Sequence, residues 1–129
     1  NGVMIHTMAR AAGILGEEKY LQAAASAARF VLETMCRQDG RLLHSWRTGE
    51  ARIDGFLDDY ANLVNALVTL YEADFDEDWL DQAVRLGEII MEQFHDPEEG
   101  GFFYTAISLT FRVGVSGKAL LKCTCDLIL

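Results

Sequence analysis

A repeat with an offset of 59 residues limits what this chain can fold into more than any other feature of its sequence. Two segments, 17–36 and 76–95, share a pattern of apolar and charged residues. The aligned pairs are Tyr20 with Trp79, Leu21 with Leu80, Glu33 with Glu92, and Met35 with Phe94. An internal repeat is a stronger indication of fold than a local motif, because each copy folds as the same unit. The chain is therefore expected to contain two similar structural units.

Both units are predicted to be helical hairpins. Residues 17–36 place apolar side chains at the i, i+3, i+4, i+7 spacing of an amphipathic helix, and a matching helix follows Asp76 or Asp78 as its cap. Residues 57–73 are apolar on most of the circumference, which is typical of a helix buried among other helices. An earlier helix is expected at 2–15, and its inward-facing side chains are Met4, Ile5, Met8, Ala12 and Leu15.

The predicted fold class is all-α, with two helical hairpins joined by long loops. Each hairpin has an apolar side that a neighbouring unit must cover. The hairpins form one domain, residues 1–106. Residues 107–129 form an atypical tail that is expected to be irregular or β-like, because β-branched residues alternate there. Its composition also changes, since basic residues outnumber acidic ones in the tail but not in residues 1–106. Such a break in composition indicates a module edge, a cloning scar or a shifted reading frame.

The composition argues against several classes of protein. A formal net charge of −9 disfavours a nucleic-acid-binding surface, because affinity for phosphates comes largely from Lys and Arg. No apolar run reaches the roughly 18–20 residues of a membrane span, and the first residues match no signal or transit peptide. Three cysteines, an odd number, favour a reducing compartment. A cytoplasmic protein without membrane or nucleic-acid partners is therefore expected.

Polar and aromatic side chains gather in the connection between the hairpins, residues 44–60. In hairpin repeats, such connections meet at one end of the assembly and line its mouth. The candidate catalytic residues are Asp59, as an acceptor of hydrogen bonds or a proton, and Arg47, as a ligand for a hydroxyl or carboxylate. The candidate substrate-binding residues are Tyr60, Trp46 and Asp58. Aromatic rings that stack on a pyranose and carboxylates that accept from its hydroxyls are typical of a sugar site, and paired carboxylates can perform acid–base chemistry.

Four of these candidates also have a structural interpretation. Asp58 and Asp59 stand at a helix start, where capping and the helix dipole favour acidic residues. Arg47 can be solvated or paired with a nearby acid, and Trp46 can pack beneath the loop. Both interpretations stay open for these four residues.

The sequence gives little indication of metal or nucleophile chemistry. The three histidines, His6, His44 and His95, lack the spacing of metal ligands, and the Cys-Thr-Cys motif at 123–125 has no second cysteine pair. Cys36 fits the role of a small hydrophobic residue at the edge of a helix. No metal and no cofactor are predicted.

A set of motifs, in order and spacing, resembles the YyaL type of thioredoxin-domain-containing protein, the spermatogenesis-associated protein 20 family. The motifs are Asn1–Ile5, Ala9–Ala11, Arg47–Gly49, Gly55–Ala61, Leu70–Ala73, Trp79-Leu80 and Gly100–Phe103. The most specific is Gly55–Ala61, with the sequence Gly-Phe-Leu-Asp-Asp-Tyr-Ala. The resemblance implies a thioredoxin-like domain followed by an (α/α)6 toroid, similar to six-hairpin glycosidases and sugar 2-epimerases. This chain would be two of the six hairpins, although residues 107–129 depart from the family's pattern.

Two functions from different classes follow as expectations. The first is a fragment of a six-hairpin glycosidase-like domain whose parent processes carbohydrate, as an epimerase or hydrolase, and binds a small sugar. The alternative is a non-catalytic interaction or scaffold domain, or a truncated product without activity. In that last case, the exposed hairpin faces are expected to cause self-association.

Overall fold

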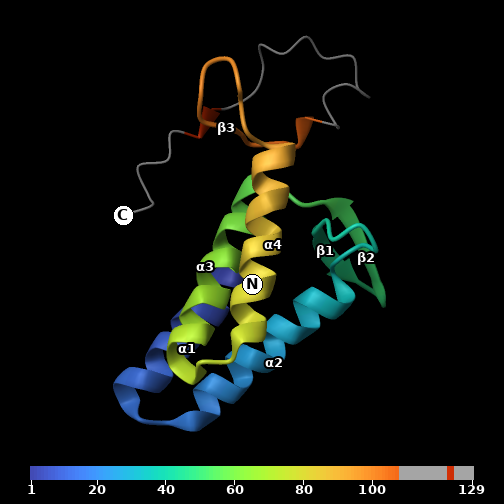
Figure 1. Ribbon diagram of the computed structural model, residues 1–129. Helices are drawn as coiled ribbons and strands as arrows, with labels where there is room; N and C mark the ends of the chain where they lie inside the picture. Colours follow the sequence, from blue (N-terminus) through green and yellow to red (C-terminus); the bar gives the residue numbers. More distant parts are fainter. Residues whose placement is uncertain (108–121, 124–129) are drawn as a thin grey trace.

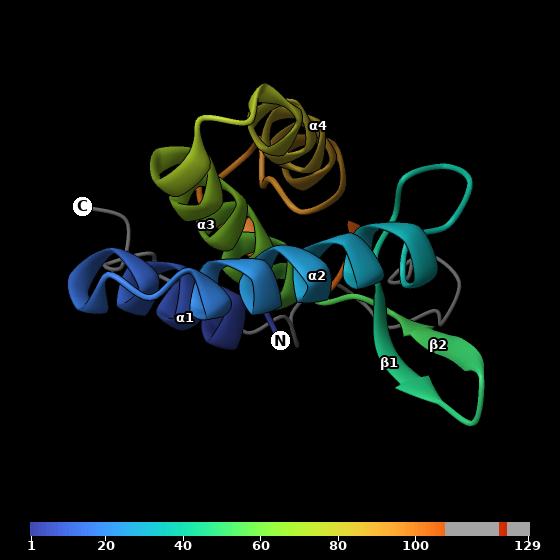
Figure 2. The ribbon, with the colours of Figure 1, turned by 90° about the horizontal axis from the view of Figure 1, so that it is seen from below.

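The computed structural model describes residues 1–107 and 122–123 of the chain, and most of it is helical. The helices are α1 (Gly2–Leu15), α2 (Glu18–Thr34), α3 (Leu57–Asp74) and α4 (Glu77–Gln93). The strands are β1 (Leu43–Arg47), β2 (Glu50–Asp54), β3 (Phe102–Phe103) and β4 (Lys122–Cys123). The helices form two hairpins, and α3 lies between α1 and α4 (Figures 1 and 2). The predicted pair of helical hairpins is confirmed.

The 59-residue repeat is visible in the positions at which the helices end. Helix α2 begins at Glu18 and ends at Thr34, and α4 begins at Glu77 and ends at Gln93, 59 residues later in each case. After each of these helices the chain turns back into an antiparallel bridge, between Cys36 and Leu42 in the first unit and between His95 and Phe102 in the second. The two units therefore share both their helices and the turn that follows them.

The turn inside each hairpin also repeats, but with different residues. Gly16 ends α1 and Phe75 ends α3, and both adopt the left-handed conformation, with φ of 66° and 58°. Glycine populates this region without penalty, whereas a residue with a Cβ atom pays roughly 1–2 kcal/mol. Phe75 is 73% exposed, so burial of its ring offsets little of that cost.

Replacing Phe75 with glycine is therefore expected to raise the free energy of unfolding by about 1 kcal/mol. Urea denaturation would measure the change. The matched substitution is Gly16→Ala, which meets no atom within 4 Å and should lower the stability by a similar amount through backbone strain alone. A loss of stability in Phe75→Gly would show that the contact of Phe75 with Tyr71, at 6.0 Å between ring centroids, outweighs the strain.

The connection between the hairpins is a β-hairpin, where the sequence predicted a long loop. Strands β1 and β2 pair antiparallel, with Arg47 opposite Glu50 and Leu43 opposite Asp54. Thr48 and Gly49 form the two-residue turn, both with positive φ, as a type I′ turn requires. The all-α prediction is therefore wrong at residues 43–54, and the β-hairpin projects from the end of α2 (Figure 2).

The core lies where α3 contacts α1, α2 and α4. Gly2 allows α1 to approach α3 closely, because a Cβ atom at Gly2 would lie 2.6 Å from the carbonyl carbon of Asn62. In α1 the buried side chains are Ile5, Ala9 and Ala12. Met4 and Leu15, predicted to face inward, are exposed, because α2 and α3, the described helices that contact α1, leave these two positions uncovered.

The tail prediction falls mostly outside the described residues. Within 107–129, the structure describes Ile107 and strand β4, which pairs antiparallel with β3. Among all the described residues, no helix is long and apolar enough to cross a membrane.

Candidate functional site

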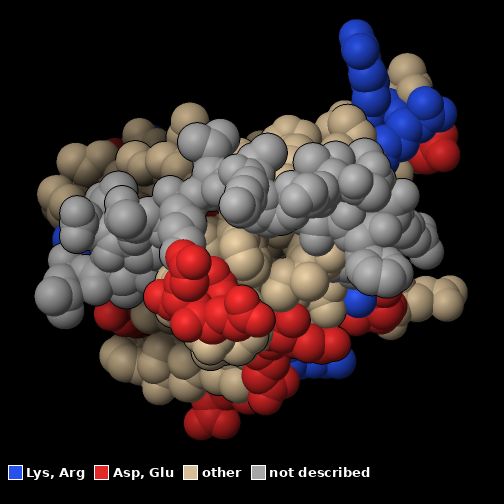
Figure 3. Space-filling view, turned by 90° about the horizontal axis from the view of Figure 1, so that it is seen from above, with Lys and Arg blue, Asp and Glu red and all other residues tan. Residues whose placement is uncertain are grey.

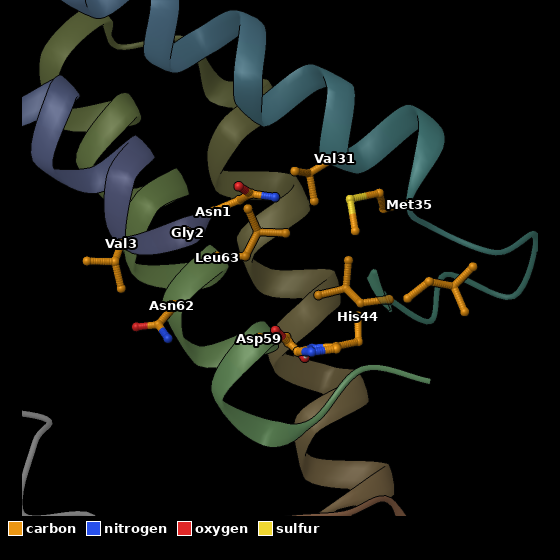
Figure 4. Close-up of a pocket in the computed structure, with 11 residues that line it drawn as sticks. Asn1, Gly2, Val3, Val31, Met35, His44, Asp59, Asn62 and Leu63 are labelled. Atoms are coloured by element: carbon orange, nitrogen blue, oxygen red, sulfur yellow. The ribbon is translucent and has the colours of Figure 1, made fainter. Parts of the chain in front are cut away.

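A small cavity of about 80 Å³ lies where the start of α1, the end of α2, strand β1 and the first turns of α3 meet (Figure 4). Its lining residues are Asn1, Gly2, Val3, Val31, Met35, Leu42, Leu43, His44, Asp59, Asn62 and Leu63. The aliphatic members come mostly from the core, and the polar members stand at the rim. Of the five candidates predicted from the sequence, Asp59 is the one that lines this cavity.

His44 and Asp59 form a hydrogen-bonded pair at this cavity. The distance from His44 Nδ1 to Asp59 Oδ2 is 2.8 Å, and both side chains are partly exposed. A carboxylate oxygen only accepts, so Nδ1 must donate, and the neutral ring then has its lone pair on Nε2. This arrangement fixes the tautomer and orientation of an imidazole that can exchange a proton through Nε2.

Asp59 also caps α3. Its Oδ2 accepts a hydrogen bond from the backbone N–H of Phe56 at 2.9 Å, as the third helical residue does in a capping box. The capping interpretation of Asp59 is therefore confirmed. The same oxygen, Oδ2, therefore accepts hydrogen bonds from both the Phe56 N–H and His44 Nδ1. Because Asp59 lies on a helix, this geometry is well defined.

Two aromatic rings, those of Phe56 and Tyr104, lie in a row beside the pair. The ring of Phe56 meets His44 edge-on, with 5.1 Å between centroids, and stacks on Tyr104 at 5.2 Å with 10° between the planes. The backbone N–H of Leu57 donates to the carbonyl oxygen of Tyr104 at 3.0 Å, which ties the second unit's return segment to the start of α3. The His44 ring is thus packed on one side and bonded on another.

Tyr60 lies in the core instead of at the predicted mouth. Its hydroxyl oxygen accepts a hydrogen bond from the backbone N–H of Leu42 at 2.8 Å, and its ring meets Phe94 edge-on at 5.2 Å. Burial raises the pKa of the Tyr60 hydroxyl, and the Leu42 N–H offsets part of that increase. These contacts give Tyr60 a structural role.

The remaining candidates occupy other surfaces. Trp46 is partly exposed and meets Phe30 of α2 edge-on at 5.6 Å, as the packing interpretation predicts. Arg47 is exposed at the end of β1, beside the turn of the β-hairpin, and Asp58 is exposed in the first turn of α3. The structure therefore does not bring Arg47 and Trp46 to the cavity that Asp59 lines, and their predicted functional roles stay predictions.

Other polar groups in the described segments have structural contacts. His6 Nδ1 lies 2.8 Å from the hydroxyl of the buried Thr69, and His95 packs edge-on against Phe102. Cys36 is half-buried, which raises the pKa of its thiol. Within residues 1–107, no three His, Cys, Asp or Glu side chains form a group that could hold a metal ion.

Viewed from above, acidic side chains gather at the centre while basic ones project at the edge (Figure 3).

Comparisons with known proteins identify the family. The chain is 35% identical over 118 residues to spermatogenesis-associated protein 20 of Rattus norvegicus and of Mus musculus, and 32% identical to that of Homo sapiens. Each match covers 84% of this chain. This chain belongs to the spermatogenesis-associated protein 20 family. The chain spans 15% of the length of these relatives, and no protein-family model matches it.

Sequence reasoning did not pair His44 with Asp59. It noted His44 only for its lack of metal-ligand spacing, because 15 residues separate it from Asp59. The available signal was local: a two-residue turn after Arg47 reverses the chain and returns it to the start of α3. Recognition of a β-hairpin over 43–54 would have placed the beginning of β1 near Asp59.

Proposed function

We propose that this region contributes an acid–base pair, His44 and Asp59, to a carbohydrate-processing domain of the epimerase or hydrolase type. The observation that supports the proposal is the 2.8 Å hydrogen bond between His44 Nδ1 and Asp59 Oδ2 at the rim of a cavity. The resemblance to six-hairpin toroids gives the substrate class by analogy of fold. The parent protein would be cytoplasmic and would join this domain to a thioredoxin-like one.

In this proposal, His44 is the group that moves a proton. Asp59 accepts from Nδ1 and orients the ring so that Nε2 can take a proton from a sugar carbon or a water molecule. Asn62, on the next turn of α3, supplies an amide that can bind a hydroxyl. Because the cavity is smaller than the roughly 300–1,000 Å³ of typical ligand pockets, other hairpins of the parent would complete the site.

The test uses the longer parent protein, with His44→Gln and Asp59→Asn. Asparagine keeps an oxygen that can accept from the Phe56 N–H but loses the charge that orients His44, so helix capping is largely retained. Turnover of a mono- or disaccharide substrate should fall by about 10²–10⁴-fold in either variant, with little change in melting temperature. His95→Gln is the control, because His95 does not line the cavity. Unchanged turnover in both variants would contradict the proposal.

A non-catalytic interaction domain is the second candidate, and the small cavity and several exposed apolar side chains favour it. The two functions differ in their response to sugars. A ligand that binds only the native state must raise its stability, so a thermal-shift screen of mono- and disaccharides on the parent separates them. A dose-dependent increase supports the carbohydrate site, and no increase with any sugar supports the interaction domain.

A further inference from the structure

The outer face of α4 is apolar and exposed, although the equivalent face of α2 is covered. Val84 and Met91 of α4 are 55% and 54% exposed. Their counterparts 59 residues earlier are Ala25, which is buried, and Leu32, which is partly buried against the core. Leu80 is likewise exposed in α4, whereas its counterpart Leu21 packs against the core. We call the three exposed residues Leu80, Val84 and Met91 the rear face.

The opposite end of the repeat shows the reverse difference. Met4 of α1 is 63% exposed, but its counterpart in the second unit, Leu63 of α3, is 2% exposed. Leu63 lines the same cavity as Val31 of α2 and Met35 directly after it, so it belongs to the surface by which the second unit covers the first. Val3, beside Met4, is also exposed. We call Met4 and Val3 the front face.

The interface inside the chain shows which surfaces are covered when two units meet. In it, α3 contacts both helices of the first unit, Leu63 lines a cavity together with Val31 of α2, and the α2 surface that contains Ala25 and Leu32 is covered. The front face is the first unit's copy of the α3 surface, and the rear face is the second unit's copy of the α2 surface. A repeat unit buries such faces by stacking with its neighbours, so one complementary surface is left open at each end of the described units.

Charge also favours contact between the two ends. The charged side chains of α4 are mainly acidic: Glu77, Asp78, Asp81, Glu88 and Glu92 against Arg85. Helix α1 contains Arg10 and no acidic residue. Contact between the ends places a basic helix against an acidic one, whereas contact between two rear faces brings like charges together.

We infer that a second copy of this chain binds the rear face through its front face, head to tail, in the manner of the internal interface. This contact is heterologous, because the two copies use different surfaces, and it leaves one open face at each end of the dimer. Association therefore continues beyond two copies as the concentration rises. The inference does not depend on the proposed carbohydrate chemistry.

The test measures mass in solution by light scattering after size-exclusion chromatography. The wild-type chain should show concentration-dependent growth beyond a dimer, weakened by salt. A rear-blocked variant, Val84→Glu with Met91→Glu, and a front-blocked variant, Met4→Glu, should each be monomeric. Because the substituted residues are exposed, both variants should keep the wild-type melting temperature and circular dichroism.

Mixing the two blocked variants distinguishes this geometry from others. Each variant retains one intact face, so the mixture should form a one-to-one dimer and nothing larger. The control is Ile14→Glu, because Ile14 and its counterpart Ala73 are both exposed and neither lies at a contact between units; it should associate like the wild type. A monomeric wild type, a blocked variant that still dimerises alone, or a mixture that stays monomeric would overturn the inference.

Discussion

Replacing Phe94 with alanine is expected to lower the free energy of unfolding by about 3–5 kcal/mol. Phe94 follows α4 directly, is 1% exposed and packs edge-on against Tyr60, with 5.2 Å between ring centroids. Removal of the ring loses its burial and leaves a cavity beside Tyr60, which cannot fill the space because its hydroxyl is bonded to Leu42. Since domains of this size are stable by about 5–15 kcal/mol, the loss should be visible as a large shift in the urea midpoint.

The repeat supplies a comparison for Phe94. Met35 occupies the same position after α2 and is also buried. Replacing Met35 with alanine should lower the free energy of unfolding by about 2–5 kcal/mol. Phe75→Ala is the control, because it removes the same ring from an exposed site. Equal, small losses in Phe94→Ala and Phe75→Ala would show that the ring of Phe94 does not stabilise the fold.

The helices could be predicted from sequence because apolar periodicity and the repeat agree with each other. Met35 and Phe94 illustrate this: the alignment pairs them, and the structure buries both after equivalent helices. Periodicity predicts that Met4 faces inward, but the structure exposes its side chain. Periodicity identifies a face, but the presence of a neighbour decides whether that face is covered.

The β-hairpin could not be predicted from periodicity because few of its side chains are buried. Trp46, Arg47, Glu50 and Arg52 are exposed, so no clear apolar alternation marks the strands. The turn sequence Thr48-Gly49 is also a weaker signal than Asn-Gly. The β-hairpin is stabilised by hydrogen bonds between its strands and by the ion pair of Asp54 with Arg37, at 2.9 Å. The apolar pattern of the sequence does not reveal these polar contacts.

The candidate site was predictable only in part, for a related reason. Asp58, Asp59 and Tyr60 are consecutive on α3 and therefore point in different directions: outward, toward His44, and into the core. Their residue types indicate a polar site, but the rotation of the helix decides which of them reaches it. Asp59 is the member of this group for which the geometry supports chemistry.

The last prediction concerns Tyr60 and has two parts. At neutral pH, Tyr60→Phe should lower the free energy of unfolding by about 1–3 kcal/mol, because the backbone N–H of Leu42 loses its acceptor in a buried position. Phenylalanine keeps the ring and its edge-on contact with Phe94, so the loss reports the hydroxyl group. Chemical denaturation at pH 7 measures this part.

The second part follows from the pKa of Tyr60. Burial raises it above the value of about 10 that the unfolded chain has. The folded state therefore holds this proton more tightly, so the stabilising contribution of the neutral hydroxyl is complete below pH 10. It is lost as the pH rises through the folded-state pKa. Phenylalanine has no proton to lose, so the stability difference between the wild type and Tyr60→Phe should narrow at pH values above 10.

Denaturation at pH 7 and pH 11 would measure the difference in the free energy of unfolding between the wild type and Tyr60→Phe. The effect of every titratable group that the two proteins share cancels in this difference. Leu86→Ala is the matched control: it removes buried apolar volume from α4 without changing a titratable group, so its deficit should be the same at both pH values. A difference for Tyr60→Phe that stays constant or grows would mean that burial does not hold the proton on Tyr60.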